Sequence, residues 1–373
     1  MAVIVVKLGS STLVDDRGAL RDAVLEARVA DLVALRAAGH RPVLVTSGAI
    51  ACGLGRLGIA ERPTALPDLQ AASAVGQGVL FERYASAFAP HGVVPAQVLL
   101  TSGDLAGRAT YLNARGTLRR LLDLGAVPVV NENDTTATDE LTFGDNDVLA
   151  AQVAILLGAA WLLLLTEREG LYARGASGPE LLGDVPPGVR PDQVELADMG
   201  GSASGRGGIV SKVASASMAT GGGVACAIGS GSVPGVIEAA IARPGAATRF
   251  HPAPRREPAF KLWLRYARPA LGRVLVDAGA AGALRERGTS LLAVGVTGCE
   301  GSFAAGDAVE VVHRGDVVGK GVSSMSSDEV RAVAGLKSDV VRTRFPEVAS
   351  EVVHRDQFVL AEGFRVRPAD GLL

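Results

Sequence analysis

Aromatic residues, cysteines and long apolar runs are scarce in this sequence, and each shortage excludes a class of protein. Phe, Tyr and Trp make up only 4% of the chain, so the core must consist mainly of Val, Leu and Ala. The three cysteines, Cys52, Cys226 and Cys299, lie far apart and form neither a CxxC pair nor a zinc-ligand spacing. This usage predicts reduced thiols in a cytoplasmic protein, without a disulfide framework. The scattered histidines likewise form no HExxH metal motif.

Charge and hydropathy exclude further classes. A formal net charge of −2 argues against chain-wide attraction to nucleic acid or to a membrane surface. No apolar run reaches the roughly 18 residues that cross a bilayer. The N-terminal stretch MAVIVVKLG lacks the charged region of a signal peptide. We therefore expect a cytoplasmic globular protein without membrane contacts, and a length of 373 residues predicts two domains.

Apolar strand-like segments alternate with helical patterns over roughly the first 240 residues. AVIVV, PVLVT, LGAVPVVN and WLLLLT are apolar throughout, as strands buried on both faces are. Helical periodicity is found between them and beyond, at 19–39, 69–88, 112–124 and 148–157, and again from Ser211, before the strand VACAIG. This alternation predicts an α/β fold with a mostly parallel open sheet covered by helices on both faces. In such sheets ligands bind beyond the carboxyl ends of the strands.

The composition changes after residue 243, where RPGAATRFHPAPRREPAF carries four prolines and four arginines. Such a stretch is typical of a domain end and a linker. Further on, short Val-rich runs alternate with Gly, Asp and Ser turns, which predicts a small, mostly β domain. We assign 1–256 to the α/β domain, 257–270 to a linker, and 271–373 to the β domain, with a core at about 271–351.

Polar clusters follow four of the predicted strands: VVKLGSST, VTSGAI, VVNENDTTATDELTFGDND and LTEREGLY. One polar strand end is ordinary turn chemistry, but four at the same edge of a sheet predict a binding site. Lys7 closes a buried apolar strand, where its desolvation is unfavourable unless an anion meets it. The small residues Gly9 and Ser10 beside it allow backbone N–H groups to approach phosphate oxygens.

A fifth cluster, GSASGRGGIVSKVASASMA, places several glycines before Lys212. We interpret it as a flexible loop, with Lys212 in the first turn of the helix that follows. Two readings stay open, a solvated surface loop and a phosphate-binding lid. Two other glycine-rich stretches are rejected: GLGRLG does not stand directly between a strand and a helix, and GDVVGK lacks the spacing and the hydroxyl residue of a P-loop.

Taken together, VVKLGSS, VTSGAI, VPVVNENDTTAT, FGDND, LLLLT…GLY and GG…SK resemble the glutamate 5-kinases of the amino acid kinase superfamily. The C-terminal region resembles the PUA domain that many bacterial members carry. The resemblance covers nearly the whole chain and implies transfer of the γ-phosphoryl group of ATP to the side-chain carboxylate of L-glutamate. That reaction gives L-glutamyl 5-phosphate, the first step of proline biosynthesis. The resemblance further implies inhibition by proline, a homodimer or homotetramer, and Mg²⁺ held mainly by the ATP phosphates, with no protein side chain assigned to it.

The resemblance also assigns roles to individual residues. Lys7 and Lys212 would stabilise the transferred phosphoryl group, and Asp147 would organise the two lysines. Glutamate would be bound by Ser47, Asp134, Asp145 and Asn146. Carboxylates would meet its ammonium group, and amide donors would meet its α-carboxylate. ATP would be bound by Lys7, Gly9, Ser10, Thr166, Glu167, Arg206, Gly207, Gly208, Ile209, Val210, Ser211 and Lys212.

Two departures from the family pattern lie on the nucleotide side. Thr166-Glu167 stands where the family usually has Thr-Asp, and Arg206-Gly207-Gly208-Ile209 stands where it usually has Thr-Gly-Gly-Met. Arg206 could contact a phosphate or point to solvent.

Two alternative functions remain at this point. One is a kinase for another small acid, such as aspartate, acetylglutamate or carbamate. The other is RNA binding by the β domain, whose basic residues are Arg265, Arg268, Arg273, Arg285, Arg287, Arg314, Lys320 and Arg331. Acidic residues are interspersed among them and no basic stripe with aromatic residues is found, so RNA is not the expected partner.

Overall fold

The computed structural model describes residues 1–15, 18–137, 146–175, 178–185 and 203–361. It divides into two compact units, one spanning Met1–Glu257 and one beginning at Pro258. The segment 257–270, expected as a linker, contains helix α9 (Ala259–Tyr266), and from Pro258 on it belongs to the second unit. Leu262, Trp263 and Leu264 of this helix are buried. Burial of these apolar side chains stabilises the helix, although prolines and arginines precede it.

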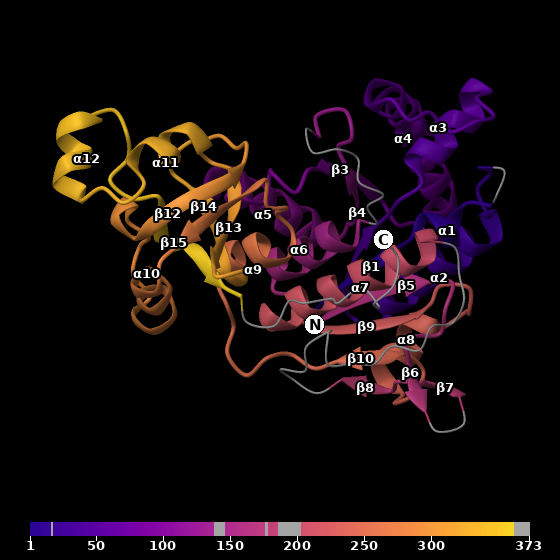
Figure 1. Cartoon of the computed structure of the whole chain (residues 1–373). Helices are drawn as coiled ribbons and strands as arrows, with labels where there is room; N and C mark the ends of the chain where they lie inside the picture. Colours follow the sequence, from indigo (N-terminus) through magenta and orange to yellow (C-terminus); the bar gives the residue numbers. More distant parts are fainter. Residues whose placement is uncertain (16–17, 138–145, 176–177, 186–202, 362–373) are drawn as a thin grey trace. The chain divides into compact units, whose positions relative to one another are not determined.

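The first unit contains one large sheet, and its predicted parallel arrangement is confirmed. Eight strands follow the order β3-β4-β2-β1-β5-β9-β10-β8, and all pairs from β3 to β9 are parallel (Figure 1). The strands are β1 (Val3–Leu8), β2 (Arg41–Val45), β3 (Pro95–Leu100), β4 (Val127–Glu132), β5 (Trp161–Thr166), β8 (Asp184–Val185), β9 (Ala225–Ser230) and β10 (Thr248–Phe250). Strand β3 is not among the predicted strands, because Pro95 and the exposed Gln97 interrupt its apolar pattern.

Helices cover both faces of this sheet, as predicted. The face formed by Ile4, Val6 and Leu8 of β1 packs against α2 (Asp22–Ala37) in one hydrophobic cluster. Because side chains alternate along a strand, Lys7 points to the other face, which α6 (Asp147–Leu157) covers. Further helices are α1 (Ser10–Leu13), α3 (Ala49–Leu57), α4 (Leu66–Phe88), α5 (Arg108–Asp123), α7 (Ala203–Gly221) and α8 (Val236–Ala242), and a small separate sheet pairs β6 (Tyr172–Gly175) with β7 (Gly178–Leu181).

Helices α3 and α4 lie against each other at a distance that only glycine permits. A Cβ atom at Gly76 of α4 would lie 1.7 Å from the carbonyl oxygen of Ala49, and one at Gly53 of α3 would lie 1.7 Å from that of Ala72. The rejected GLGRLG stretch thus lies within α3 and its end, where Gly53 serves helix packing. This contact fixes α4 beside the loop that follows β2.

We expect Gly76→Ala to lower the free energy of unfolding by about 3 kcal/mol, because the added methyl group forces the two backbones apart. Gly78→Ala on the same helix is the matched control, since a Cβ there meets no atom within 4 Å. The control should stabilise the protein by up to about 1 kcal/mol through helix propensity. Urea unfolding measures both changes, and equal stabilities of the two variants would contradict the packing role of Gly76.

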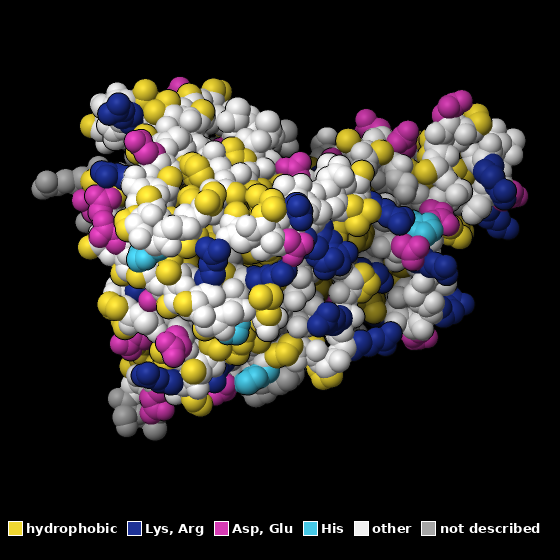
Figure 2. Space-filling view, turned by 180° about the vertical axis from the view of Figure 1, so that it is seen from behind, with side chains coloured by type: hydrophobic (Ala, Val, Ile, Leu, Met, Phe, Trp, Pro, Cys, Tyr) yellow, Lys and Arg dark blue, Asp and Glu magenta, His cyan; other side chains and the backbone are white. Residues whose placement is uncertain are grey.

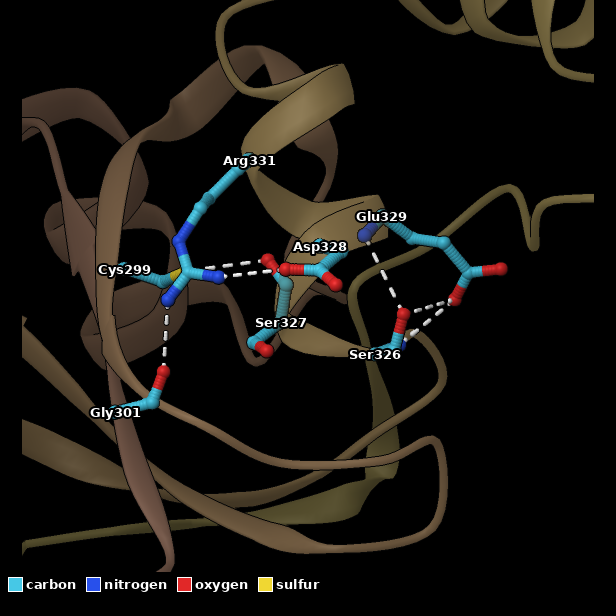
Figure 3. A network of polar contacts seen from close by, with 7 residues as sticks. All are labelled: Cys299, Gly301, Ser326, Ser327, Asp328, Glu329 and Arg331. Atoms are coloured by element: carbon cyan, nitrogen blue, oxygen red, sulfur yellow. Dashed lines mark hydrogen bonds and ion pairs between the residues drawn. The ribbon is translucent and has the colours of Figure 1, made fainter.

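The second unit is built on a five-stranded sheet in the order β12-β11-β13-β14-β15, as the predicted β domain requires. Its strands are β11 (Gly272–Val276), β12 (Val296–Gly301), β13 (Ala308–His313), β14 (Asp316–Ser323) and β15 (Val353–Leu360), and its further helices are α10 (Ala278–Gly282), α11 (Ser327–Val333) and α12 (Ser338–Arg344). A capping box of Ser326 and Glu329 starts α11, and Arg331 ties this helix to the carbonyl oxygen of Gly301 at 2.8 Å (Figure 3).

All three cysteines are free thiols, as predicted. Within the described residues, no helix combines the length and apolarity that crossing a bilayer requires. In the space-filling view, hydrophobic side chains are scattered among charged ones on the face shown (Figure 2).

Candidate active site

The predicted polar clusters meet at one edge of the large sheet, because β4, β2, β1 and β5 are adjacent and parallel. Lys7 is the second-last residue of β1, paired with Val45 of β2 and Leu164 of β5. Ser47 follows β2, and the segment with Asp134 follows β4. The start of α6 brings Asn146 and Asp147 to the same edge.

Asp147 lies between the two lysines. Its Oδ1 is 2.8 Å from Nζ of Lys7, and its Oδ2 is 3.1 Å from Nζ of Lys212. Lys7 and Asp147 are fully buried, and Lys212 is only 6% exposed. The three groups come from a strand, the first residue of a helix, and the middle of another helix, so tertiary structure alone brings them together.

The charges of this cluster favour an incoming anion. Among the described residues this cluster holds two ammonium groups and one carboxylate, and buried charges are unfavourable unless compensated. The buried thiol of Cys226 lies close to the cluster. Burial raises the pKa of Cys226 well above its ordinary value, and the negative charge of Asp147 raises this pKa further. The thiol therefore stays protonated and contributes no charge.

The prediction that Lys212 lies in the first turn of a helix is wrong. Helix α7 begins at Ala203, so the backbone of Gly205, Gly207 and Gly208 is already helical. Each helical glycine costs only about 1 kcal/mol relative to alanine, and packing of α7 on α6 and β9 can offset that cost. Lys212 thus projects from within a helix, which fixes its position more tightly than a loop would.

Asn146 stands at the N-cap position of α6, where its side chain makes no capping hydrogen bond, and it is held by two hydrogen bonds from its amide nitrogen. Its Nδ2 donates to the backbone carbonyl of Thr46 at 2.5 Å and to Oδ1 of Asn131 at 2.6 Å. In this arrangement no amide hydrogen is left for the substrate carboxylate to which this amide was expected to donate. The acceptor Oδ1 is the group that remains for a ligand.

Ser47 and Asp134 supply further polar groups at this edge. The hydroxyl oxygen of Ser47 is buried and has no hydrogen-bond partner among the described residues, which suits a group that meets a ligand. Asp134 accepts a hydrogen bond from the hydroxyl of Ser73. Burial raises the pKa of Asp134, and the bond from Ser73 and the charge of Arg62 lower it in part. Asp145 lies outside the described residues.

Helix α4 contributes a set of polar residues that the sequence analysis did not identify. Gln70, Ser73 and Gln77 lie on one face of this helix, and all bond to the segment that follows β4 or to its last residue. Two helical turns after Gln77, Tyr84 is fully buried, with its hydroxyl 2.8 Å from that of Thr46. Polar side chains at helical spacing were the available signal, but an amphipathic surface helix has the same pattern.

The residues expected to bind ATP lie at the ends of β1 and β5 and in α7. Gly9 is buried and precedes α1, while Ser10 is exposed. Thr166 ends β5, and the exposed Glu167 lies 4.0 Å from Arg21, a surface pair that contributes little stability. The backbone of Ile209, Val210 and Ser211 belongs to α7. The side chain of Arg206 lies outside the described residues, so neither reading of it is tested.

Several basic residues of the second unit are engaged within that unit. Arg273 lies 3.1 Å from Glu310, Arg268 lies 3.3 Å from Asp307, and Arg331 lies 2.8 Å from Asp328 (Figure 3). Nζ of Lys320 donates to the carbonyl oxygens of Arg265 at 3.1 Å and of Arg268 at 2.7 Å. These contacts speak against a continuous basic surface made by these residues for RNA.

Comparisons with known proteins agree with this architecture. The profile of the Amino acid kinase family matches residues 2–230, and that of the PUA domain matches residues 272–345. The glutamate 5-kinase of Salinispora arenicola is 43% identical over 364 residues, with 96% of this chain and 97% of that protein covered. The glutamate 5-kinase of Ralstonia pickettii is 42% identical over 362 residues, with 96% of each protein covered.

Among solved structures, the carbamate kinase from Giardia lamblia bound to AMP-PNP is similar at 15% identity, with a TM-score of 0.48, over 67% of this chain and 98% of that chain.

Proposed function

The chain belongs to the glutamate 5-kinases of the amino acid kinase family and carries a C-terminal PUA domain, and on this premise we propose which residues perform its reaction. It is a kinase that phosphorylates glutamate. In detail, the side-chain carboxylate of L-glutamate attacks the γ-phosphorus of ATP, the bond from that phosphorus to the bridging oxygen breaks, and L-glutamyl 5-phosphate and ADP are released. The attacking carboxylate is ionised at neutral pH, so no general base is needed.

The main barrier to this reaction is electrostatic, because an anion must approach a polyphosphate. Phosphoryl transfer depends on in-line positioning and on cations around the transferred group. The observation that carries the proposal is the buried cluster in which Asp147 holds Lys7 at 2.8 Å and Lys212 at 3.1 Å. Lys7 and Lys212 would stabilise the charge that develops on the phosphoryl oxygens, and Asp147 would keep the like-charged amines together.

The substrates would occupy neighbouring parts of this edge. Ser47, Asp134 and Asn146, with Asp145, would bind glutamate, because they gather at the ends of β2 and β4 and at the start of α6. Gly9, Ser10, Thr166, Glu167 and 206–212 would bind ATP. Mg²⁺ would be held mainly by the phosphates, since both carboxylate oxygens of Asp147 already lie against lysines.

The family assignment supports three further proposals. The product would enter proline biosynthesis as its first intermediate, proline would inhibit the enzyme, and the chain would form a homodimer or homotetramer.

A panel of acceptors in an assay of ADP release tests the proposed substrate. We expect L-glutamate to support turnover with a kcat/KM at least 100-fold above that of L-aspartate, N-acetyl-L-glutamate and carbamate. A preference for any of these three would assign the chain to a different substrate within the same family. Release of ADP that does not depend on any acceptor would contradict the proposed reaction.

The pH dependence of glutamate binding should follow Asp134. Its raised pKa means that this carboxylate is protonated at a higher pH than an exposed aspartate, so the KM for glutamate should rise as the pH falls through that pKa. Ser73→Ala removes an interaction that lowers this pKa, so the acidic limb of the KM profile should move to higher pH. Profiles of KM between pH 4 and pH 8 measure the shift. An acidic limb at the same pH in both enzymes would contradict the role of Asp134.

A further inference from the structure

The amide side chains behind Asn146 form a chain of hydrogen bonds that runs to helix α4. Nδ2 of Asn146 donates to the carbonyl of Thr46 at 2.5 Å and to Oδ1 of Asn131 at 2.6 Å. Nδ2 of Asn131 donates to Oε1 of Gln77 at 3.0 Å. Nε2 of Gln77 in turn donates to the carbonyl of Glu132 at 3.0 Å. Three amides thus follow one another between two backbone carbonyl groups.

The backbone fixes the orientation of every amide in this chain. A backbone carbonyl only accepts hydrogen bonds, so the atoms facing Thr46 and Glu132 must be amide nitrogens. The backbone N–H of Glu132 lies 3.0 Å from Oδ1 of Asn131 and requires an oxygen there. Turning any one amide over would place two donors or two acceptors against each other.

This fixed polarity determines what Asn146 can recognise. Both of its amide hydrogens are used within the protein, so this buried side chain can offer a ligand only the acceptor Oδ1. Of the groups of L-glutamate at neutral pH, the two carboxylates accept and only the ammonium group donates. We propose, building on the function proposed above, that Asn146 accepts a hydrogen bond from the substrate's ammonium group and that Gln77 is a positioning residue, which holds Asn131 and through it Asn146 in place.

Helix α4 is a suitable support for such a positioning residue. Nε2 of Gln70 donates to the carbonyl of Ala137 at 3.2 Å, and Ser73 bonds to Asp134, so the face that carries Gln77 holds the segment after β4 at two more points. Glycine contacts with α3 fix the position of α4 itself. A group carried on a rigid element loses little freedom when the substrate binds.

Replacement of Gln77 by methionine tests the positioning role. Methionine keeps the length of the side chain but can neither accept from Asn131 nor donate to Glu132, so the hydrogen bond that holds Nδ2 of Asn131 is lost. We expect the KM for L-glutamate to rise about tenfold, as loss of one buried hydrogen bond implies. The kcat and the KM for ATP should stay within twofold. Gln97→Met, on the exposed side of β3, is the matched control and should match the wild type.

A conservative variant separates the polar role from packing. Gln77→Glu keeps the acceptor for Asn131 and loses the donor to Glu132, so its KM for glutamate should lie between those of the wild type and Gln77→Met. If Gln77→Met has an unchanged KM for glutamate, Gln77 is not a positioning residue. If Gln77→Glu is no better than Gln77→Met, the hydrogen bond that Gln77 accepts from Asn131 is not what matters and the proposal is overturned.

Glutarate tests which substrate group Asn146 meets, because it retains both carboxylates and lacks the ammonium group. We expect its inhibition constant against L-glutamate to differ by less than twofold between the wild type and Gln77→Met, since the damaged contact does not exist for it. An inhibition constant that rises together with the KM would assign Asn146 to a carboxylate and overturn the proposal. Glutamate-dependent ADP release by the wild type tests the proposed function separately. A failure of the Gln77 proposal can therefore be told apart from a failure of the proposed function.

Discussion

Asp147→Ala should lower kcat by at least 100-fold while raising the KM for glutamate by only a fewfold. The substitution removes the carboxylate that holds Nζ of Lys7 at 2.8 Å and Nζ of Lys212 at 3.1 Å. Two buried ammonium groups then repel each other and leave their positions beside the phosphoryl group. Loss of a preorganised electrostatic group typically costs about 10²–10³ in kcat.

The same substitution should also destabilise the protein. Removing one partner of a buried ion pair leaves an uncompensated charge, which costs about 3–5 kcal/mol. Asp147→Asn is therefore measured beside it. Asparagine has the size of aspartate but no charge, and its single amide oxygen can accept a hydrogen bond from one of the two lysines. A loss of kcat in a folded Asp147→Asn enzyme assigns the effect to charge.

Asp123→Ala is the matched control for Asp147. Its carboxylate also lies 2.8 Å from a cation, Nη1 of Arg41, but this pair is on the surface. Exposed pairs contribute 0 to about 1 kcal/mol, so both kcat and stability should stay near the wild-type values. If Asp147→Ala had the same kcat as this control, the proposed catalytic role of Asp147 would be contradicted.

Lys212→Met should lower kcat by about 10²–10³ with little loss of stability. The variant deletes a positive charge next to the transferred group but retains the aliphatic part of the side chain, and Asp147 still has Lys7 at 2.8 Å. In Lys212→Met the oppositely charged Lys7 and Asp147 still pair in the folded state. In Asp147→Ala two buried lysines lose their partner. Single-turnover measurements at saturating ATP and glutamate separate the chemical step from binding.

Lys337→Met is the control for this variant, because Lys337 is exposed in the second unit. It should leave kcat and both KM values unchanged. If Lys212→Met raised only the KM for ATP and left kcat intact, Lys212 would bind the nucleotide equally in the ground and transition states. Its role in stabilising phosphoryl transfer would then be withdrawn.

The sequence by itself determined the fold class and the edge of the sheet at which polar residues gather. The runs Val3–Leu8 and Trp161–Thr166 are strands that are buried except at their end residues, as their composition predicts. The composition changes after residue 243, and the structure divides into two compact units between Glu257 and Pro258. These features are local, because periodicity and β-branched content act within one element. For the same reason β3, which begins with proline and exposes a glutamine, was missed.

Tertiary structure decided which polar atoms meet. Sequence placed Asn146 next to Asp147, but its amide can both donate and accept, and only the carbonyl of Thr46 and the oxygen of Asn131 consume its hydrogens. Gln77 resembles any polar residue of an amphipathic helix until α4 is seen against the segment after β4. Helix α7 begins eight residues before the expected start at Ser211, since packing offsets the low propensity of its glycines. The polarity of hydrogen bonds and the ends of helices depend on residues that are distant in the sequence. The local sequence pattern carries no information about these partners.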